Sequence, residues 1–193
     1  MPTRISIRVA MVALALCVRP LIGQAGVGDS AVVYGAHHAF SLQAPAGWIL
    51  DVRSQRNNGL PVVLYLRGES WTTGAAVMYV NTVVPDSGVV DAVPEVIRAD
   101  SERFSNVVPG MHVSVAMRLQ TADGRAAEVR AFHGDSGNVE LVAYIPARTI
   151  IAVVVLSART RAALASARSA FEALVKSYRF LTDQVTVRPE PAT

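Results

Sequence analysis

The sequence has almost no cysteine. Its 193 residues include one, Cys17, which lies in an apolar stretch near the N-terminus. Acylation of Cys17, as in a bacterial lipoprotein, is disfavoured because the preceding Leu16 is bulky. The rest of the chain offers no thiol for a disulfide or a metal site. The 168 residues after position 25 must rely on their core, which is feasible because such a chain buries roughly 70% of its unfolded surface.

Motifs of catalysis are also missing. The sequence has no Gly-x-Ser-x-Gly motif, which presents a serine nucleophile, and no His-x-x-x-His pair, which presents two metal ligands on one helix face. No glycine-rich loop joins a predicted strand to a predicted helix in the way that holds phosphates. We therefore expect a protein that is not an enzyme and that carries no metal and no cofactor.

Residues 1–22 have the features of a secretory signal. Arg4 and Arg8 precede an apolar run at residues 9–18, and Gly23-Gln24-Ala25 places small side chains where a signal peptidase reads them. The apolar run is too short to span a bilayer comfortably. We expect a signal peptide at residues 1–25, no stable membrane insertion after cleavage, and a secreted or periplasmic location in a bacterium. Retention of the segment as an anchor is the alternative.

The net charge of the cleaved chain is predicted to be zero. The whole sequence carries 18 Lys and Arg against 15 Asp and Glu, a formal charge of +3. Three of the basic residues (Arg4, Arg8 and Arg19) and none of the acidic ones lie in residues 1–25, so 15 of each sign remain. A neutral chain gives no support to nucleic-acid binding, and we expect none.

The centre of the fold is predicted from residues 138–180. Two apolar, β-branched runs, at residues 138–146 and 149–156, predict an antiparallel hairpin. The second run is apolar on both alternating faces, so it should lie in the middle of a sheet that is covered on both sides. A helix follows at residues 160–178, capped by Thr160. Its apolar face consists of Leu164, Ala167, Phe171, Leu174, Val175 and Tyr178.

The other segments are predicted from alternation and turn residues. We expect a loose lead-in at residues 26–36, a single domain at residues 37–181 and a disordered tail at residues 182–193. Before the central hairpin the domain should contain a hairpin of residues 40–42 and 48–52 around Pro45-Ala46-Gly47, strands at residues 62–66 and 75–84, a helix at residues 91–104 capped by Asp91, and a hairpin of residues 113–119 and 125–132 around Asp123-Gly124.

This order of elements favours an α+β fold. Consecutive strands joined by tight turns are antiparallel, so we expect a mainly antiparallel sheet of about seven or eight strands. The two principal helices are predicted at residues 91–104 and 160–178. The same order argues against a doubly wound nucleotide-binding sheet, which needs parallel strands.

Two stretches resemble a known family. Residues 40–48 read FSLQAPAGW, which resembles the F-x-L-x-x-P-x-G-W opening of the PsbP-like superfamily, and the ending at Ser177-Tyr178-Arg179-Phe180 is similar to that of its members. The superfamily includes an extrinsic subunit of photosystem II, a Ran-binding import factor and many exported bacterial proteins. The resemblance covers residues 36–181. It implies an α/β/α sandwich around an antiparallel sheet, with no shared catalytic residues and no matching metal ligands.

One loop contains the residue types of a hydrolase. His133-Gly134-Asp135-Ser136 places a base, a carboxylate and a hydroxyl close together in the sequence, as a nucleophilic triad needs. Asp, Ser and Gly are also the residues that a tight turn uses, and we favour the turn.

The histidines could assemble a metal site with Asp135 or Asp51. His37 and His38 are adjacent, however, and neighbouring residues on an extended segment point to opposite faces, which makes a poor chelate. We therefore favour exposed histidines at strand ends, His112 and His133 among them.

Trp71 lies in a predicted loop with Arg67 and Glu69. Aromatic and arginine side chains are favoured at binding surfaces. A tryptophan folded back over the edge of the sheet is an equal alternative. The candidate binding residues are therefore Trp71, Arg67, His133 and Asp135.

The function that we expect is non-catalytic. The leading hypothesis is an exported domain that binds an unknown protein partner in the envelope or outside the cell, or that supports an envelope assembly. The alternative is a small-ligand-binding protein that uses a cleft between sheet and helix, with an apolar pocket and a few convergent polar groups. A hydrolase comes third. The partner, the ligand, the pathway and the oligomeric state stay open.

Overall fold

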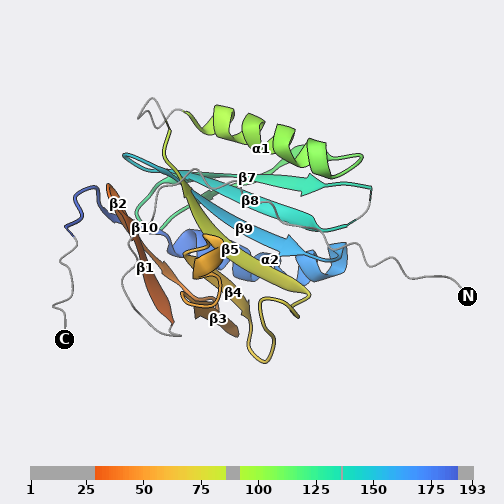
Figure 1. Ribbon diagram of the computed structural model, residues 1–193, viewed down its shortest axis with the longest axis horizontal. Coiled ribbons are helices and arrows are strands. Elements are labelled where there is room, and N and C mark those ends of the chain that lie inside the picture. The colour runs from red at the N-terminus through yellow and green to blue at the C-terminus, as the bar shows by residue number, and fades with distance from the viewer. Residues whose placement is uncertain (1–28, 86–91, 136, 187–193) are drawn as a thin grey trace, which may run out of the picture.

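The computed structural model describes residues 29–85, 92–135 and 137–186. These residues form strands, two α-helices and one short 3-10 helix (Figure 1). In chain order the elements are β1 (Ser30–Gly35), β2 (His38–Gln43), β3 (Trp48–Asp51), η1 (Arg56–Asn58), β4 (Val62–Leu66), β5 (Ala76–Val83), α1 (Val93–Val107), β6 (His112–Gln120), β7 (Ala126–His133), β8 (Val139–Pro146), β9 (Ile151–Ala158), α2 (Arg161–Ser177) and β10 (Arg179–Thr182).

The strands form two antiparallel sheets. The large sheet has seven strands in the order β3-β4-β5-β9-β8-β7-β6, and the small sheet has three in the order β1-β2-β10. Strands β6 to β9 contain the two predicted hairpins, β6–β7 and β8–β9, and form a meander in which each strand pairs with the next along the chain. The predicted α+β fold class, with its mainly antiparallel sheet and two principal helices, is confirmed.

The two helices cover opposite faces of the large sheet (Figure 1). Strand β9 shows this alternation: Ile151, Val153 and Val155 pack in the core under α1, whereas Ala152, Val154 and Leu156 pack in the core under α2. Every residue of β9 is buried, as the uniformly apolar run predicted. The result is an α/β/α sandwich.

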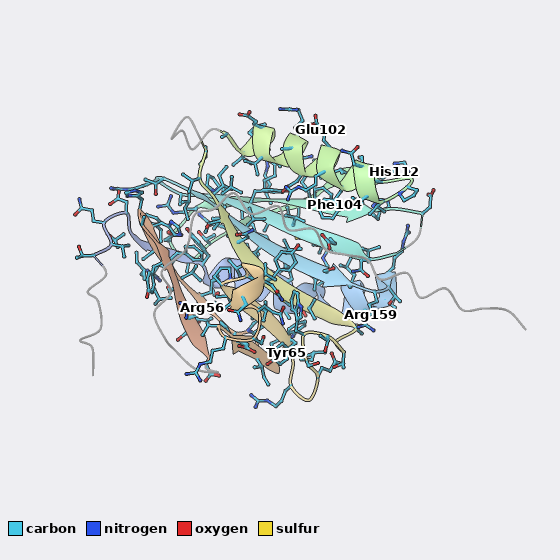
Figure 2. All side chains as sticks on the ribbon, in the orientation of Figure 1. Arg56, Tyr65, Glu102, Phe104, His112 and Arg159 are labelled. Carbon is cyan, nitrogen blue, oxygen red and sulfur yellow. The ribbon has the colours of Figure 1, made fainter. Side chains whose placement is uncertain are left out.

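The larger core lies under α2. Phe171 and Leu174 of α2 and Tyr178, the residue after it, are fully buried there, and the ring of Phe40 from the small sheet lies 5.0 Å from that of Tyr178. The Thr160 side chain caps α2 by accepting a hydrogen bond from the Ala163 amide at 3.1 Å. Under α1 the Phe104 and Phe132 rings lie 5.1 Å apart, and Figure 2 shows Phe104 on the sheet side of that helix and Glu102 on the other side.

Helix α1 differs from its prediction at both ends. It begins at Val93, with Ala92 at the N-cap position and no side-chain cap, and it continues to Val107 rather than ending at 104. Asp91, the predicted cap, lies outside the described residues. The predicted signal at residues 1–25 and most of the predicted tail (187–193) also lie outside them.

Two predictions at the N-terminal side are wrong. Residues 30–35 are not a loose lead-in, because they form β1, which pairs with β2 along its whole length and buries Ala31 and Val33. The segments around Pro45-Ala46-Gly47 do not form a hairpin either. Strand β2 pairs with β1 and β10, while β3 pairs with β4, so the turn carries the chain from the small sheet to the large one.

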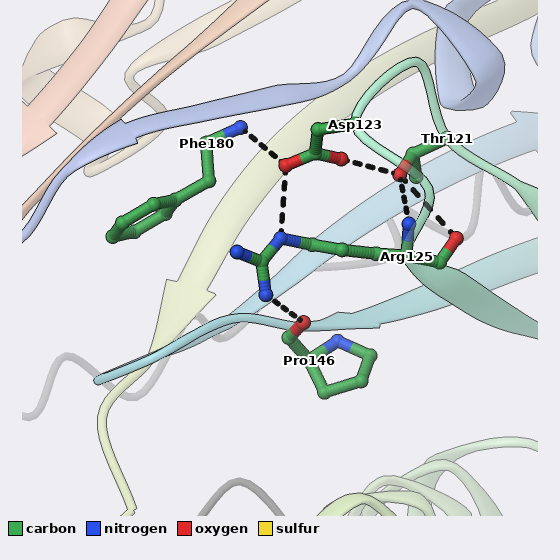
Figure 3. A network of polar contacts seen from close by, with 5 residues as sticks. All are labelled: Thr121, Asp123, Arg125, Pro146 and Phe180. Atoms are coloured by element: carbon green, nitrogen blue, oxygen red, sulfur yellow. Dashed lines mark hydrogen bonds and ion pairs between the residues drawn. The ribbon is translucent and has the colours of Figure 1, made fainter.

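A polar network joins the β6–β7 turn to the C-terminal strand (Figure 3). Asp123 accepts hydrogen bonds from the Thr121 hydroxyl at 2.6 Å, the Phe180 amide at 2.9 Å and the Arg125 Nε at 2.9 Å. Arg125 also donates to the Pro146 carbonyl at 3.3 Å and lies 5.1 Å from the centre of the Phe180 ring. Burial raises the pKa of Asp123, but the donors outweigh burial and the net shift is downward. The network therefore holds three separate segments together.

Candidate functional site

A small hollow lies at the end of the large sheet where β5 begins and β9 ends. Its volume is about 140 Å³. It is lined by Trp71, Gly74, Ala75, Val77, Asn138, Ser157 and Arg159. We call it the Trp71 hollow. It combines one large aromatic side chain with an amide, a hydroxyl and a guanidinium group, which come from three separate parts of the chain.

The loop that carries Trp71 is held by its own hydrogen bonds. The Ser70 amide donates to the Thr73 hydroxyl at 3.1 Å, and the Gly74 amide donates to the Ser70 carbonyl at 2.9 Å. Arg159 fastens this loop to the end of β9, because its Nη2 donates to the Thr72 carbonyl at 2.7 Å. Figure 2 labels Arg159 at this end of the sheet. The loop is therefore fixed before anything binds.

The Trp71 side chain is half-buried and has a fixed neighbour. Its ring meets the ring of Tyr79 edge-on, with the centroids 6.0 Å apart. Edge-to-face aromatic pairs contribute about 0.5–1.5 kcal/mol beyond their buried area. Trp71 thus packs back on the sheet through Tyr79 and also lines a surface hollow, and its role in binding stays a prediction.

The pairing of β9 with β5 and with β8 places polar side chains beside the hollow. Val77 pairs with Ser157 on β9, and Ser157 pairs with Glu140 on β8, so the three side chains form one row on the α1 face. Asn138 donates to the Ser157 hydroxyl at 3.3 Å. Ser157 is 4% exposed, and Glu140, on its far side, is 9% exposed with Oε2 lacking a hydrogen-bond partner.

Two acids behind the hollow, Glu140 and Asp100, have pKa values that burial shifts upward. Burial raises the pKa of Glu140 to about 7, with the Ser157 hydroxyl lowering it and the nearby Asp100 carboxyl raising it further. Burial also raises the pKa of Asp100, against the opposing effects of the Tyr144 hydroxyl, which donates to it at 2.8 Å, and of Arg103, which forms an ion pair with it. Glu140 lies on the α1 face of the sheet and Asp100 belongs to α1, and neither lines the hollow, which itself offers hydrogen bonding and aromatic contact.

The structure separates the four predicted binding residues. Trp71 lines the hollow, whereas Arg67 is exposed and its amide donates to the Gly47 carbonyl at 2.9 Å. His133 pairs with His112 across two strands, with the rings 5.7 Å apart, and the Asp135 carboxyl packs against Gly110. The β7–β8 connection that contains Asp135 contributes Asn138 to the hollow instead.

The described residues test the predicted metal set and only part of the predicted hydrolase set. Ser136 lies outside the described residues, so the triad has no described nucleophile. Within the described part of the chain no group of three or more His, Cys, Asp or Glu side chains could hold a metal ion. The prediction of exposed histidines is wrong for His38, which is 5% exposed and stacks on Phe40 in the small sheet. Burial, and then the nearby His37, lowers the pKa of His38.

Four polar residues in or beside the hollow were not among the predicted binding residues: Asn138, Glu140, Ser157 and Arg159. Glu140 is the one carboxylate in an otherwise apolar strand, and Ser157 follows the apolar run of β9. A single acid in a strand that is buried on both faces indicates, from the sequence alone, a buried carboxyl group with a shifted pKa.

A second, larger hollow of about 430 Å³ lies against the small sheet. It is lined by Val32, Tyr34, Ala39, Thr182, Gln184, Val185 and Thr186. Both hollows are thus lined by strand and loop residues rather than by helix residues. Among the described residues, no helix is long and apolar enough to cross a membrane.

The fold is PsbP-like, as the resemblance at residues 40–48 predicted. The chain is similar to the solution structure of cyanobacterial PsbP (CyanoP) from Synechocystis sp. PCC 6803, with a TM-score of 0.52 and 12% sequence identity over 87% of this chain and 99% of that one. No protein-family model matches the chain, and neither does any curated protein.

Proposed function

We propose that this chain is an exported, non-catalytic accessory domain that binds a protein partner, and that the Trp71 hollow receives one side chain of that partner. The observation that carries the proposal is a fixed, half-buried tryptophan that lines a hollow of about 140 Å³. Tryptophan is among the residues that contribute most at protein interfaces, and such residues act in well-packed pockets.

The size of the hollow favours a partner side chain over a free ligand. Sites for small molecules usually have volumes of about 300–1,000 Å³. The Trp71 hollow is well below that range. Its polar groups (Asn138, Ser157 and Arg159) can orient a side chain, and its rigid loop reduces the entropy that binding costs.

The fold and the sequence support the accessory role. The chain shares a PsbP-like fold with CyanoP, but a fold by itself does not set a function, and the role is inferred from the site. The site offers binding groups: an aromatic ring, an amide, a hydroxyl and a guanidinium group. Export is supported by the predicted signal at residues 1–25.

The proposal is tested by native mass spectrometry of the tagged chain, isolated from the envelope of the cell that produces it. We expect a bound mass of protein size on the unaltered chain, lost in Trp71→Ala and kept in Leu181→Ala, which removes an exposed apolar side chain from the small sheet. Thermal melts should show that Trp71→Ala is still folded. A bound mass that survives Trp71→Ala, or one of small-molecule size, would overturn the proposal.

A further inference from the structure

The large sheet ends in one long edge strand. Strand β6 has nine residues and pairs with β7 on one side, and no described strand pairs with its other side. The opposite edge of the sheet, β3, has only four residues and ends in the charged Asp51. An edge strand offers unpaired backbone amides and carbonyls, and short length or charge is the usual protection against pairing. Strand β6 has the less protected edge.

The first half of β6 has the composition of a pairing strand. Residues 112–116 read HVSVA and contain no acidic residue, lysine, arginine or proline. Val115 is 62% exposed, an unusual exposure for a β-branched apolar side chain in a strand. A bulge at Ala116 lies between the pairs Val115–Arg130 and Met117–Val129, and it changes the face of the sheet on which the following side chains lie.

The bulge divides β6 into two parts with different roles. Before it, Val113 and Val115 lie on the α1 face, opposite Phe132 and Arg130. After it, Met117 and Leu119 pack into the core under α2. The second part is therefore used within the domain, whereas the edge of the first part is unoccupied among the described residues.

We infer that two copies of the chain associate through this edge, with residues 112–116 of one copy antiparallel to the same residues of the other and the two-fold axis at Ser114. Antiparallel pairing of identical segments is self-complementary, as a two-fold dimer requires. In this register Val113 faces Val115 of the second copy, and Ser114 faces Ser114. Each exposed valine is then covered by a β-branched cross-strand partner.

Side-chain alternation and the bulge restrict the register. Residues that face each other across a pair must lie on the same face of the sheet, so a shift by one residue would place Val113 opposite Ser114, which lies on the other face. An axis at Val115 would place Val113 of one copy opposite Met117 of the other, and Met117 lies beyond the bulge and on the opposite face of the sheet. The Ser114 axis pairs both valines and brings no charges of the same sign together.

The association should be weak and dependent on concentration. Five paired residues form an interface at the small end of the known range, for which a dissociation constant between about 1 µM and 1 mM is expected. Sedimentation velocity on the unaltered protein should show a shift from monomer to dimer in that range. Val115→Lys should weaken dimerisation by about tenfold or more, since it buries a charge at the pair, and Val32→Lys on the small sheet should not change it.

Cross-linking tests the register. Facing residues of an antiparallel pair have Cα atoms about 4.5–5.5 Å apart, within disulfide range whichever type of pair Ser114 forms. With Cys17→Ser as background, Ser114→Cys should give a disulfide-linked dimer on mild oxidation, and Gln120→Cys, exposed beyond the bulge, should not. A protein that stays monomeric at about 1 mM, equal cross-linking of both variants, or a different protein's strand on this edge would each overturn the inference.

Discussion

Glu140→Gln is expected to change the pH dependence of stability, because Glu140 is a buried acid with a free carboxylate oxygen. Burial is the main reason that its pKa rises from 4.5 to about 7. Between these two pH values the folded chain holds a proton that the unfolded chain has released. The raised pKa of Glu140 therefore contributes its full stabilisation when the pH is below the pKa of the unfolded state. That contribution is lost as the pH rises through the pKa of the folded state.

The size of the effect follows from the same shift. One proton changes the free energy of unfolding by about 1.4 kcal/mol per pH unit, so the rise from 4.5 to about 7 corresponds to about 3 kcal/mol. The unaltered protein should lose this amount between about pH 4.5 and somewhat above pH 7. Glu140→Gln removes the titrating group while keeping its shape, so the variant should lack that part of the decline.

Urea unfolding, followed by tryptophan fluorescence at several pH values from 5 to 8, measures the difference between the two proteins. The informative quantity is the change of that difference with pH, since a constant offset reports only how well the new amide is hydrogen-bonded. Glu102→Gln is the matched control, because the Glu102 side chain is 61% exposed. Parallel stability curves for Glu140→Gln and the unaltered protein would refute the reasoning.

Three further substitutions test the fold. Asp123→Ala should cost about 2 kcal/mol near pH 7 in urea unfolding, since it removes the acceptor of three hydrogen bonds. Because the folded pKa of Asp123 lies below 3.8, that cost should shrink as the pH falls below about 4, and a constant cost would contradict it. Thr160→Ala should cost about 1 kcal/mol through the lost cap of α2, and an unchanged urea midpoint would show that the cap is unimportant. Phe171→Ala should cost about 3–5 kcal/mol in the same assay, because the side chain is fully buried; a loss below about 1 kcal/mol would mean that α2 is not packed as described.

The parts of the fold that are set by residues close together in the sequence were predictable. The β8–β9 hairpin and helix α2 each carry their own periodicity and turn or cap residues. Strand β1 was missed because its buried side chains, Ala31 and Val33, are small and give little contrast with their neighbours. The turn before β3 was misread because turn residues reveal a change of direction and not which sheet receives the next strand.

The Trp71 hollow could be predicted only in part. Trp71 was found because an aromatic residue in a polar loop is visible in the sequence. Asn138 and Ser157 meet it through the register of β5, β9 and β8, which pairs residues about twenty to eighty positions apart. Conversely, Arg67 is close to Trp71 in the sequence but does not line the hollow. Closeness in sequence was therefore a poor guide to the site, and strand register was the missing information.

Site-specific photo-cross-linking in the envelope tests the central claim most directly. A photoreactive residue at Thr72, which is exposed beside Trp71, should cross-link to one protein of defined mass. The same residue at Val32, on the small sheet, should not yield that product, and adding Trp71→Ala to the Thr72 variant should abolish it. A product that forms equally from both positions, or that persists with Trp71→Ala, would contradict partner binding at the Trp71 hollow.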